Sequence, residues 1–258
     1  QQVRAAPQDA ALRVFLFQLL AVTGQWQRAA TQLQVCGELD AGTLAMVATY
    51  RDALPGEALR EAVFAGRTTP VVFGRPQPWV AWLVEALQAD ARGDTAGARA
   101  LRERAFDEAP ATPGEADGQA FDWIADADSR LGPVLEAVIQ GRYAWVPFDA
   151  LTEIDIEAPA DLRDLVWAPA RLGFVNGGEA MALVPVRYAG TAATGDGALR
   201  LSRRTDWAAL DEPAGHWRGL GQRVFTTSAG DLDLLSVRQL RLRPAPAPDA
   251  PAAGDGDP

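Results

Sequence analysis

The side chains with the most chemical potential are the carboxylates of ADADSR (125–130), in which Asp126 and Asp128 stand two positions apart. Two carboxylates at this spacing, the DxD pattern, can hold Mg²⁺ or Mn²⁺ against a nucleotide diphosphate. Such a site also needs a buried strand before the pair and basic contacts for the phosphates, whereas FDWIADA (121–127) is polar and leads into a turn. We therefore expect the pair to cap the chain and to form a network with Arg130. A metal-dependent transferase or hydrolase that uses Asp126 and Asp128 is the alternative.

The residue inventory excludes most familiar catalytic sites. All 24 basic residues are Arg, so P-loop, Schiff-base and kinase sites have no Lys to use. The single Cys36 and the single His216 are too few for a zinc site and stand 180 positions apart. Neither GxSxG nor GxGxxG occurs, which argues against a hydrolase elbow and a dinucleotide fold. The sequence thus predicts no cofactor, no metal and no enzymatic activity.

The negative charge is concentrated in one segment. The net charge is −10, and residues 111–164 hold 12 acidic side chains against three Arg. Such a segment repels nucleic acid and attracts a basic partner surface by electrostatic steering. The alternative is an acidic surface that only keeps the protein in solution.

Aromatic side chains alternate with these acids. Trp123, Tyr143, Trp145 and Trp167 are of the type that can clamp a basic amphipathic helix, although aromatics near strands more often pack in the core. In LTEIDIE (151–157) the acids alternate with Ile, which predicts an acidic exposed strand face. The candidate protein-binding residues are therefore Asp126, Asp128, Arg130, Tyr143, Trp145, Glu153 and Glu157.

The N-terminal part, residues 1–110, has the pattern of stacked helix pairs. In ALRVFLFQLLAV (11–22) large apolar residues recur with helical spacing, and the pattern ends at Gly24. A similar helix, Gly turn and second helix return at 79–110, with Gly93 standing 69 positions after Gly24. This distance is close to two units of about 34 residues, the period of tetratricopeptide (TPR) repeats. The unit at 42–75 is degenerate, so we expect a TPR-like array.

The C-terminal part changes to a period of two. We expect a linker at 111–119, a short helix at 131–140, and a strand-rich mixed domain at 120–243, which together give an α+β fold. Asn176, Gly177 and Gly178 predict a hairpin turn. Strands are expected at 142–148, 151–157, 198–202, 222–226 and 234–242, and a disordered tail at 244–258.

Several segments together resemble a known family. They are FDWIADADSRLGPVLEAVIQGRYAWVPF (121–148) and DLRDLVWAPARL (161–172), supported by RVFLFQLLAVTGQWQRAATQL (13–33), REAVFAGRTTP (60–70), VPVRYAG (184–190), LSRRTDW (201–207) and GLGQRVF (219–225). In this order they resemble the ImpE/SciE/TagJ family of type VI secretion accessory proteins. The resemblance covers nearly the whole chain.

The resemblance implies a non-enzymatic adaptor. It implies contact with the small sheath subunit of the secretion machine and a link to the ClpV ATPase that recycles the contracted sheath. One cysteine and no signal-peptide pattern at the start predict a cytoplasmic protein. The most apolar run, 14–22, is too short to span a bilayer, so no membrane partner is expected.

Overall fold

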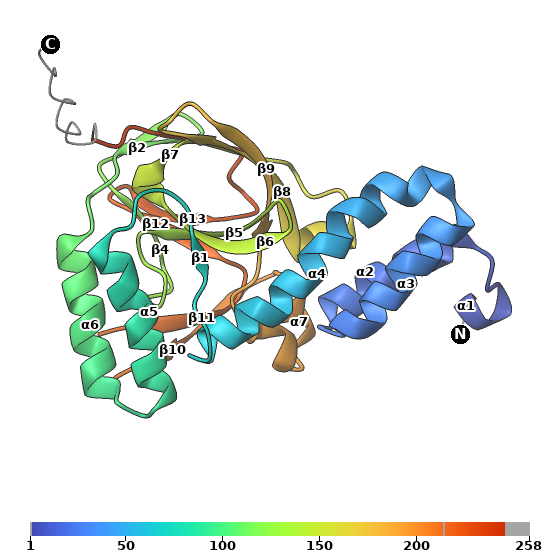
Figure 1. Cartoon of the computed structure of the whole chain (residues 1–258), viewed down its shortest axis with the longest axis horizontal. Helices are drawn as coiled ribbons and strands as arrows, with labels where there is room; N and C mark the ends of the chain where they lie inside the picture. The colour runs from blue at the N-terminus through green and yellow to red at the C-terminus, as the bar shows by residue number, and fades with distance from the viewer. Residues whose placement is uncertain (1, 214, 246–258) are drawn as a thin grey trace, which may run out of the picture.

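The computed structural model describes residues 2–213 and 215–245. Its N-terminal part is helical (Figure 1). The helices are α1 (Gln2–Ala5), α2 (Ala10–Val22), α3 (Trp26–Leu39), α4 (Leu44–Phe64), α5 (Pro78–Ala91) and α6 (Thr95–Glu108), with the 3-10 turn η1 (Ala41–Thr43) before α4. α2 with α3 and α5 with α6 form two helical hairpins, and α4 lies between them (Figure 1).

The two hairpins follow from local sequence signals. The side chains of Asp9 and Asp94 cap α2 and α6 by accepting backbone N–H bonds of 3.1 and 2.9 Å. Gly24 and Gly93 turn the chain between paired helices with φ of 70° and 78°, a region that disfavours other residues. The unit at 42–75 does not form a pair, because α4 is one helix of 21 residues that continues through Pro55.

The C-terminal part is built mainly from antiparallel strands. A nine-stranded sheet has the order β1-β6-β5-β9-β8-β7-β14-β2-β3, in which only β1 and β6 are parallel neighbours. β10-β11 and β13-β12-β4 form two smaller sheets. The strands of the large sheet are β1 (Val71–Val72), β2 (Gly114–Ala116), β3 (Gln119–Phe121), β5 (Val134–Ile139), β6 (Arg142–Pro147), β7 (Leu151–Ile156), β8 (Trp167–Phe174), β9 (Glu179–Pro185) and β14 (Gln239–Leu242). The small sheets contain β4 (Ile124–Asp126), β10 (Thr205–Ala209), β11 (Trp217–Gly221), β12 (Val224–Thr227) and β13 (Gly230–Asp233).

The large sheet curls around one core and carries the helices on its other side (Figure 1). The inner core joins side chains of β5, β7, β8, β9 and β14 to Phe225 of β12. On the outer side, Val138 and Trp167 pack with α2, α3 and α4, and Tyr143 and Trp145 pack with α4, α5 and α6. Every residue of β5 is buried, because both faces of this strand are covered.

The expected α+β class, with helices before a strand-rich mixed part, is confirmed. The predicted strands at 142–148 and 151–157 correspond to β6 and β7, and the predicted hairpin corresponds to β8-β9. The predicted strand at 222–226 corresponds to β12. Apart from the short β1, strands begin at Gly114, earlier than the change of pattern suggested.

Four local expectations differ from the structure. Residues 134–139 form β5 rather than a helix, because a short run that is buried on both faces shows no alternation. Residues 197–200 form helix α7 rather than a strand, since Asp196 caps its N-terminus by accepting two backbone N–H bonds. The expected linker at 111–119 contains β2 and the start of β3. Only 239–242 of the predicted strand at 234–242 forms a strand. The expected disordered tail at 244–258 lies mostly outside the described residues, which end at 245.

In the ranges 2–213 and 215–245, none of the helices is both long and apolar enough to cross a bilayer.

Candidate functional site

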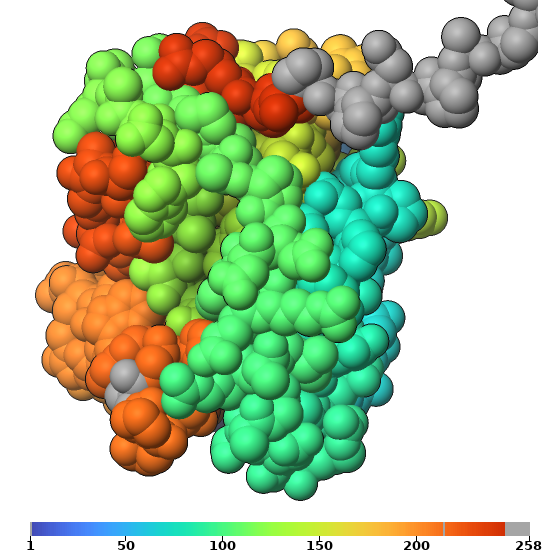
Figure 2. All heavy atoms as spheres, turned by 90° about the vertical axis from the view of Figure 1, so that its left-hand side faces the viewer, coloured from blue at the N-terminus to red at the C-terminus, as the bar shows by residue number. Residues whose placement is uncertain are grey.

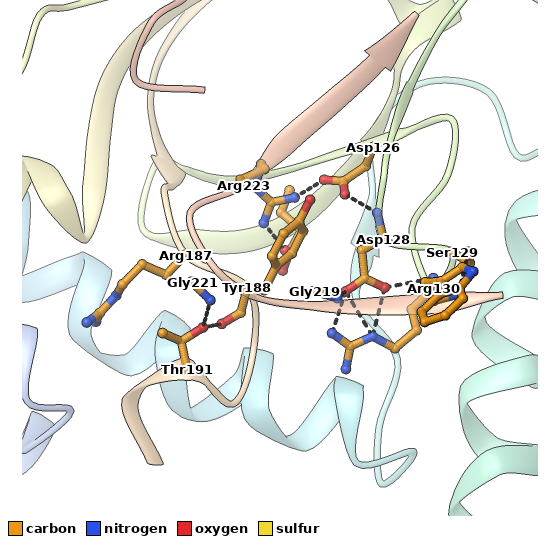
Figure 3. A network of polar contacts seen from close by, with 12 residues as sticks. Asp126, Asp128, Ser129, Arg130, Arg187, Tyr188, Thr191, Gly219, Gly221 and Arg223 are labelled. Atoms are coloured by element: carbon orange, nitrogen blue, oxygen red, sulfur yellow. Dashed lines mark hydrogen bonds and ion pairs between the residues drawn. The ribbon is translucent and has the colours of Figure 1, made fainter. Parts of the chain in front are cut away.

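A chain of buried charges crosses the middle of the fold (Figure 3). Arg223, in the turn before β12, forms ion pairs with Asp126 of β4 and Glu136 of β5. Arg60 of α4 approaches the same Glu136 from the helical side, with Nε 2.7 Å from Oε1 and Nη2 2.9 Å from Oε2. The Tyr143 hydroxyl also donates to Glu136. One carboxylate therefore connects the helices, the large sheet and the three-stranded sheet.

Burial raises the pKa of both acids in this network, but the neighbouring charges shift the net result in opposite directions. Burial by itself raises the pKa of Glu136, but the Arg60 and Arg223 charges outweigh it and hold the pKa at about 2. Burial also raises the pKa of Asp126, and the single positive charge of Arg223 does not offset this effect. The negative charges of Asp128 and Glu136 raise the pKa further, to about 7. Glu136 is thus firmly ionised, whereas Asp126 titrates near neutral pH.

The predicted network of Asp128 with Arg130 is present (Figure 3). Arg130 Nε donates to Asp128 Oδ1 at 2.9 Å and Nη2 to Oδ2 at 2.5 Å, and the Gly219 backbone N–H donates to Oδ2 at 3.0 Å. The backbone N–H of Asp128 in turn donates to Asp126 Oδ1 at 2.8 Å. Both carboxylates are therefore occupied by arginine and backbone donors. In the described part of the chain, His, Cys, Asp and Glu residues form no cluster of three or more that is arranged to hold a metal ion.

The candidate protein-binding residues do not share one surface. Asp126, Asp128, Tyr143 and Trp145 are at most 2% exposed, and Arg130 is 7% exposed. The rings of Tyr143 and Trp145 are buried because the outer side of β6 faces α4 and α5. The structure therefore places these five side chains in the interior, where a partner has no access to them.

The acidic strand face exists but is mostly paired. Arg171 of β8 lies 3.0 Å from Glu153 and also pairs with Asp155, and Arg241 of β14 pairs with Glu153. Only Glu157, just after β7, is exposed. Cross-strand arginines thus neutralise much of the charge that the sequence suggested was free.

The lone Cys36 and His216 are not brought together. Cys36 is buried on α3. His216 lies at the other end of the molecule, where its Nδ1 is 2.8 Å from Asp211 Oδ2 and its ring packs on Phe106 of α6. Figure 2 shows this region, with the segment around 205–217 in orange beside α6 in green.

Two hollows were not foreseen from the sequence. An open groove of about 440 Å³ runs between α5 and the segment around β1, with Pro70, Val72, Val80, Ala81 and Val84 as its apolar lining. A more enclosed cavity of about 200 Å³ lies between α4, the start of α3 and the loop at 187–193. The groove is apolar and the cavity is charged, so they suit different occupants.

Comparison with known proteins identifies the family. The profile of the ImpE protein family matches residues 118–241. The chain is 54% identical over 247 residues to the type VI secretion system accessory component TagJ of Pseudomonas aeruginosa, an alignment that covers 96% of this chain and 86% of that protein. The crystal structure of a Vibrio parahaemolyticus protein superposes with a TM-score of 0.85 at 23% identity, covering 94% of this chain and 90% of that one, which supports the fold. The chain therefore belongs to the ImpE/SciE/TagJ family.

Proposed function

We propose that this protein is a non-enzymatic accessory component of a type VI secretion system. In this proposal it binds the small sheath subunit and assists the handling of the sheath by the ClpV ATPase. The observation that carries the proposal is the 54% identity, over almost the whole chain, to a protein named as an accessory component of that system. The proposal includes a cytoplasmic location, because that is the compartment this role requires.

The state of the polar groups supports an adaptor more than an enzyme. The acids that could serve a metal-dependent reaction, Asp126 and Asp128, are held by Arg223 and Arg130 inside the fold. A catalytic pair needs access to its substrate, whereas these carboxylates are at most 2% exposed. Their contacts fit a structural role, since paired and hydrogen-bonded charges are the form in which proteins bury them.

The groove beside α5 is the surface that we assign to the sheath subunit. Its lining of Pro, Val and Ala side chains suits the apolar face of a partner segment. Glu85 lies on its wall, and the net charge of −10 favours approach of a basic partner. An amphipathic segment with basic flanks therefore fits the groove best.

Ala81→Glu tests this assignment. Ala81 is an exposed residue of α5 in the groove, so a carboxylate there places a charge against the apolar lining with little effect on folding. We expect the affinity for the purified small sheath subunit, measured by calorimetry, to fall about tenfold or more. The matched control is Ala91→Glu, at an exposed position of the same helix that does not line the groove.

The outcomes separate the surface from the function. Equal binding by wild type and Ala81→Glu would refute the groove but not the adaptor role. Absence of binding by the wild-type chain, together with absence of a ternary complex with ClpV, would refute the proposed partners themselves.

A further inference from the structure

The enclosed cavity lies at the seam between the helices and the sheet. Its walls include Glu57, Arg60 and Glu61 of α4, Trp26 at the start of α3, and Arg187 and Thr191 of the loop at 187–193. Glu57, Arg60 and Arg187 are only 4–6% exposed. Its volume of about 200 Å³ equals that of about seven water molecules at about 30 Å³ each. A small polar molecule of that size fits the space.

Glu57 and Arg60 form an ion pair with each other, but each keeps one polar atom without a hydrogen bond. Arg60 uses Nε and Nη2 for Glu136 and for the Arg187 carbonyl, and its Nη1 is 3.6 Å from Glu57 Oε2, too far for a hydrogen bond. Glu57 Oε1 accepts from the indole N–H of Trp167 at 2.8 Å, so Oε2 is the oxygen that accepts no hydrogen bond. Among the described residues, neither Arg60 Nη1 nor Glu57 Oε2 has another hydrogen-bond partner. This ion pair of the cavity wall thus keeps one donor, Arg60 Nη1, and one acceptor, Glu57 Oε2, that can each form a hydrogen bond with a ligand lying across the pair.

Arg187 adds a positive charge without a carboxylate. Its Nη1 donates to the carbonyls of Val22 and Arg200 at 2.6 and 2.8 Å, and its Nη2 to the carbonyl of Ala21 at 3.3 Å. These carbonyls lie at the C-terminal ends of α2 and α7, which carry only partial negative charge. Within the described ranges no carboxylate reaches ion-pair distance of Arg187. Burial consequently lowers the pKa of Arg187 to about 10.

Two carboxylates of α4, Glu57 and Glu61, also line the cavity. Glu61 lies at the mouth, where it accepts the indole N–H of Trp26 at 3.1 Å. Glu61 and Glu57 can receive a cationic group, and the Trp26 ring can stack against it. A simple anion would meet these two carboxylates, and a simple cation would meet Arg60 and Arg187. The lining therefore matches a ligand that carries both charges.

We propose that this cavity binds a small zwitterion of the free α-amino-acid type. Its carboxylate accepts from Arg60 Nη1 and lies on the side of Arg187. Its ammonium group donates to Glu57 Oε2 on the side of Glu61 and Trp26. The ligand then bridges α4 and the loop at 187–193.

Thermal unfolding with defined probes tests the ligand class. Glycine, L-alanine and L-glutamate are added separately at up to 10 mM, with acetate as the carboxylate-only probe and methylammonium as the ammonium-only probe. We expect at least one amino acid to raise the Tm by about 3 °C or more at ten times its Kd, and neither single-charge probe to do so. No shift with any amino acid, or an equal shift with acetate, overturns the proposal.

Two variants localise the effect. Glu57→Gln keeps an oxygen for the Trp167 N–H but removes the negative charge, and we expect at least a tenfold weaker affinity for the amino acid. Ala193→Phe places a ring at the mouth and leaves every buried charge in place; we expect it to abolish the shift. Ala209→Phe, at an exposed position away from the cavity, is the matched control. If Glu57→Gln fails to fold, the Ala193→Phe variant alone tests the site. An unchanged ligand-induced Tm shift in either folded variant would mean that the ligand binds elsewhere and would overturn the proposal.

Discussion

Asp126 and Glu136 share Arg223, yet neutralising each of them is expected to have a different effect on stability. A pKa of about 2 for Glu136, against an ordinary value of 4.5, corresponds to about 3 kcal/mol in favour of the ionised form in the folded protein. Glu136→Gln also leaves Arg60 and Arg223 without their shared carboxylate. Breaking a buried ion pair costs about 3–5 kcal/mol, and we expect Glu136→Gln to lower the free energy of unfolding by that amount.

Asp126→Asn is expected to cost far less and to change the pH dependence. The pKa of Asp126 in the folded protein, about 7, lies above its ordinary value of 3.8. Between pH 3.8 and 7, Asp126 is therefore protonated in the folded protein but ionised in the unfolded chain. This group therefore stabilises the fold as the pH falls below about 7, by about 3 kcal/mol at pH 5 and by about 4 kcal/mol once the pH is below about 4. Asp126→Asn should remove that slope and leave the stability at pH 8 nearly unchanged or improved.

Urea unfolding at pH 5.5, 6.5, 7.5 and 8.5 measures both effects on wild type and the two variants. Asp122→Asn is the control, since Asp122 is an exposed acid near the same strand. A loss of 3 kcal/mol or more in Asp126→Asn at pH 8, or an unchanged slope, would refute the reasoning. It would show that the ion pair with Arg223 outweighs burial and that Asp126 is ionised throughout.

Three further predictions concern other parts of the molecule. Trp145→Ala should lower the free energy of unfolding by about 3–5 kcal/mol in urea titrations, because this ring is fully buried beneath α4 and α5; a loss below 1 kcal/mol contradicts the packing. Gly219→Ala should destabilise the protein by about 1–3 kcal/mol, since the added Cβ would lie 2.2 Å from the Tyr188 ring. The control is Gly118→Ala, where a Cβ meets open space and only the positive φ of that residue should lower the stability. If the acidic segment steers the sheath subunit, Glu157→Arg and 0.5 M salt should each slow association in surface plasmon resonance without altering the dissociation rate; unchanged association rates would mark the segment as solvated surface.

Contacts that are local in sequence were predictable. The helical hairpins follow from the 3.6-residue spacing and the glycine turns, and the pairing of Asp128 with Arg130 spans only two positions. The pairings of Arg223 with Asp126 and of Arg60 with Glu136 span 97 and 76 positions and depend on how the layers pack. A signal for them was nevertheless present, because Arg223 is directly followed by the apolar Val224 and Phe225, where a lone charge needs a buried partner.

Burial also could not be deduced from residue type. Tyr143 and Trp145 have the composition of a binding surface, and only the helices that cover β6 make them core residues. The groove beside α5 shows the converse case. Its Pro, Val and Ala side chains have the composition of a core, so the sequence does not show that they line a surface groove. Whether an apolar side chain is covered depends on neighbours that are distant in the chain.

The position of Glu136 bears on how the protein can be divided. The segment that matches the family profile, 118–241, contains Glu136 and its partner Arg223. The second partner of Glu136, Arg60, lies outside that segment, in α4. A fragment limited to that segment would lose half of the charge compensation of Glu136 and would expose Tyr143, Trp145 and Trp167 to water. The matched segment therefore lacks the helices that cover one face of its sheet, and these N-terminal helices act as a wall of the C-terminal sheet rather than as an attachment to it.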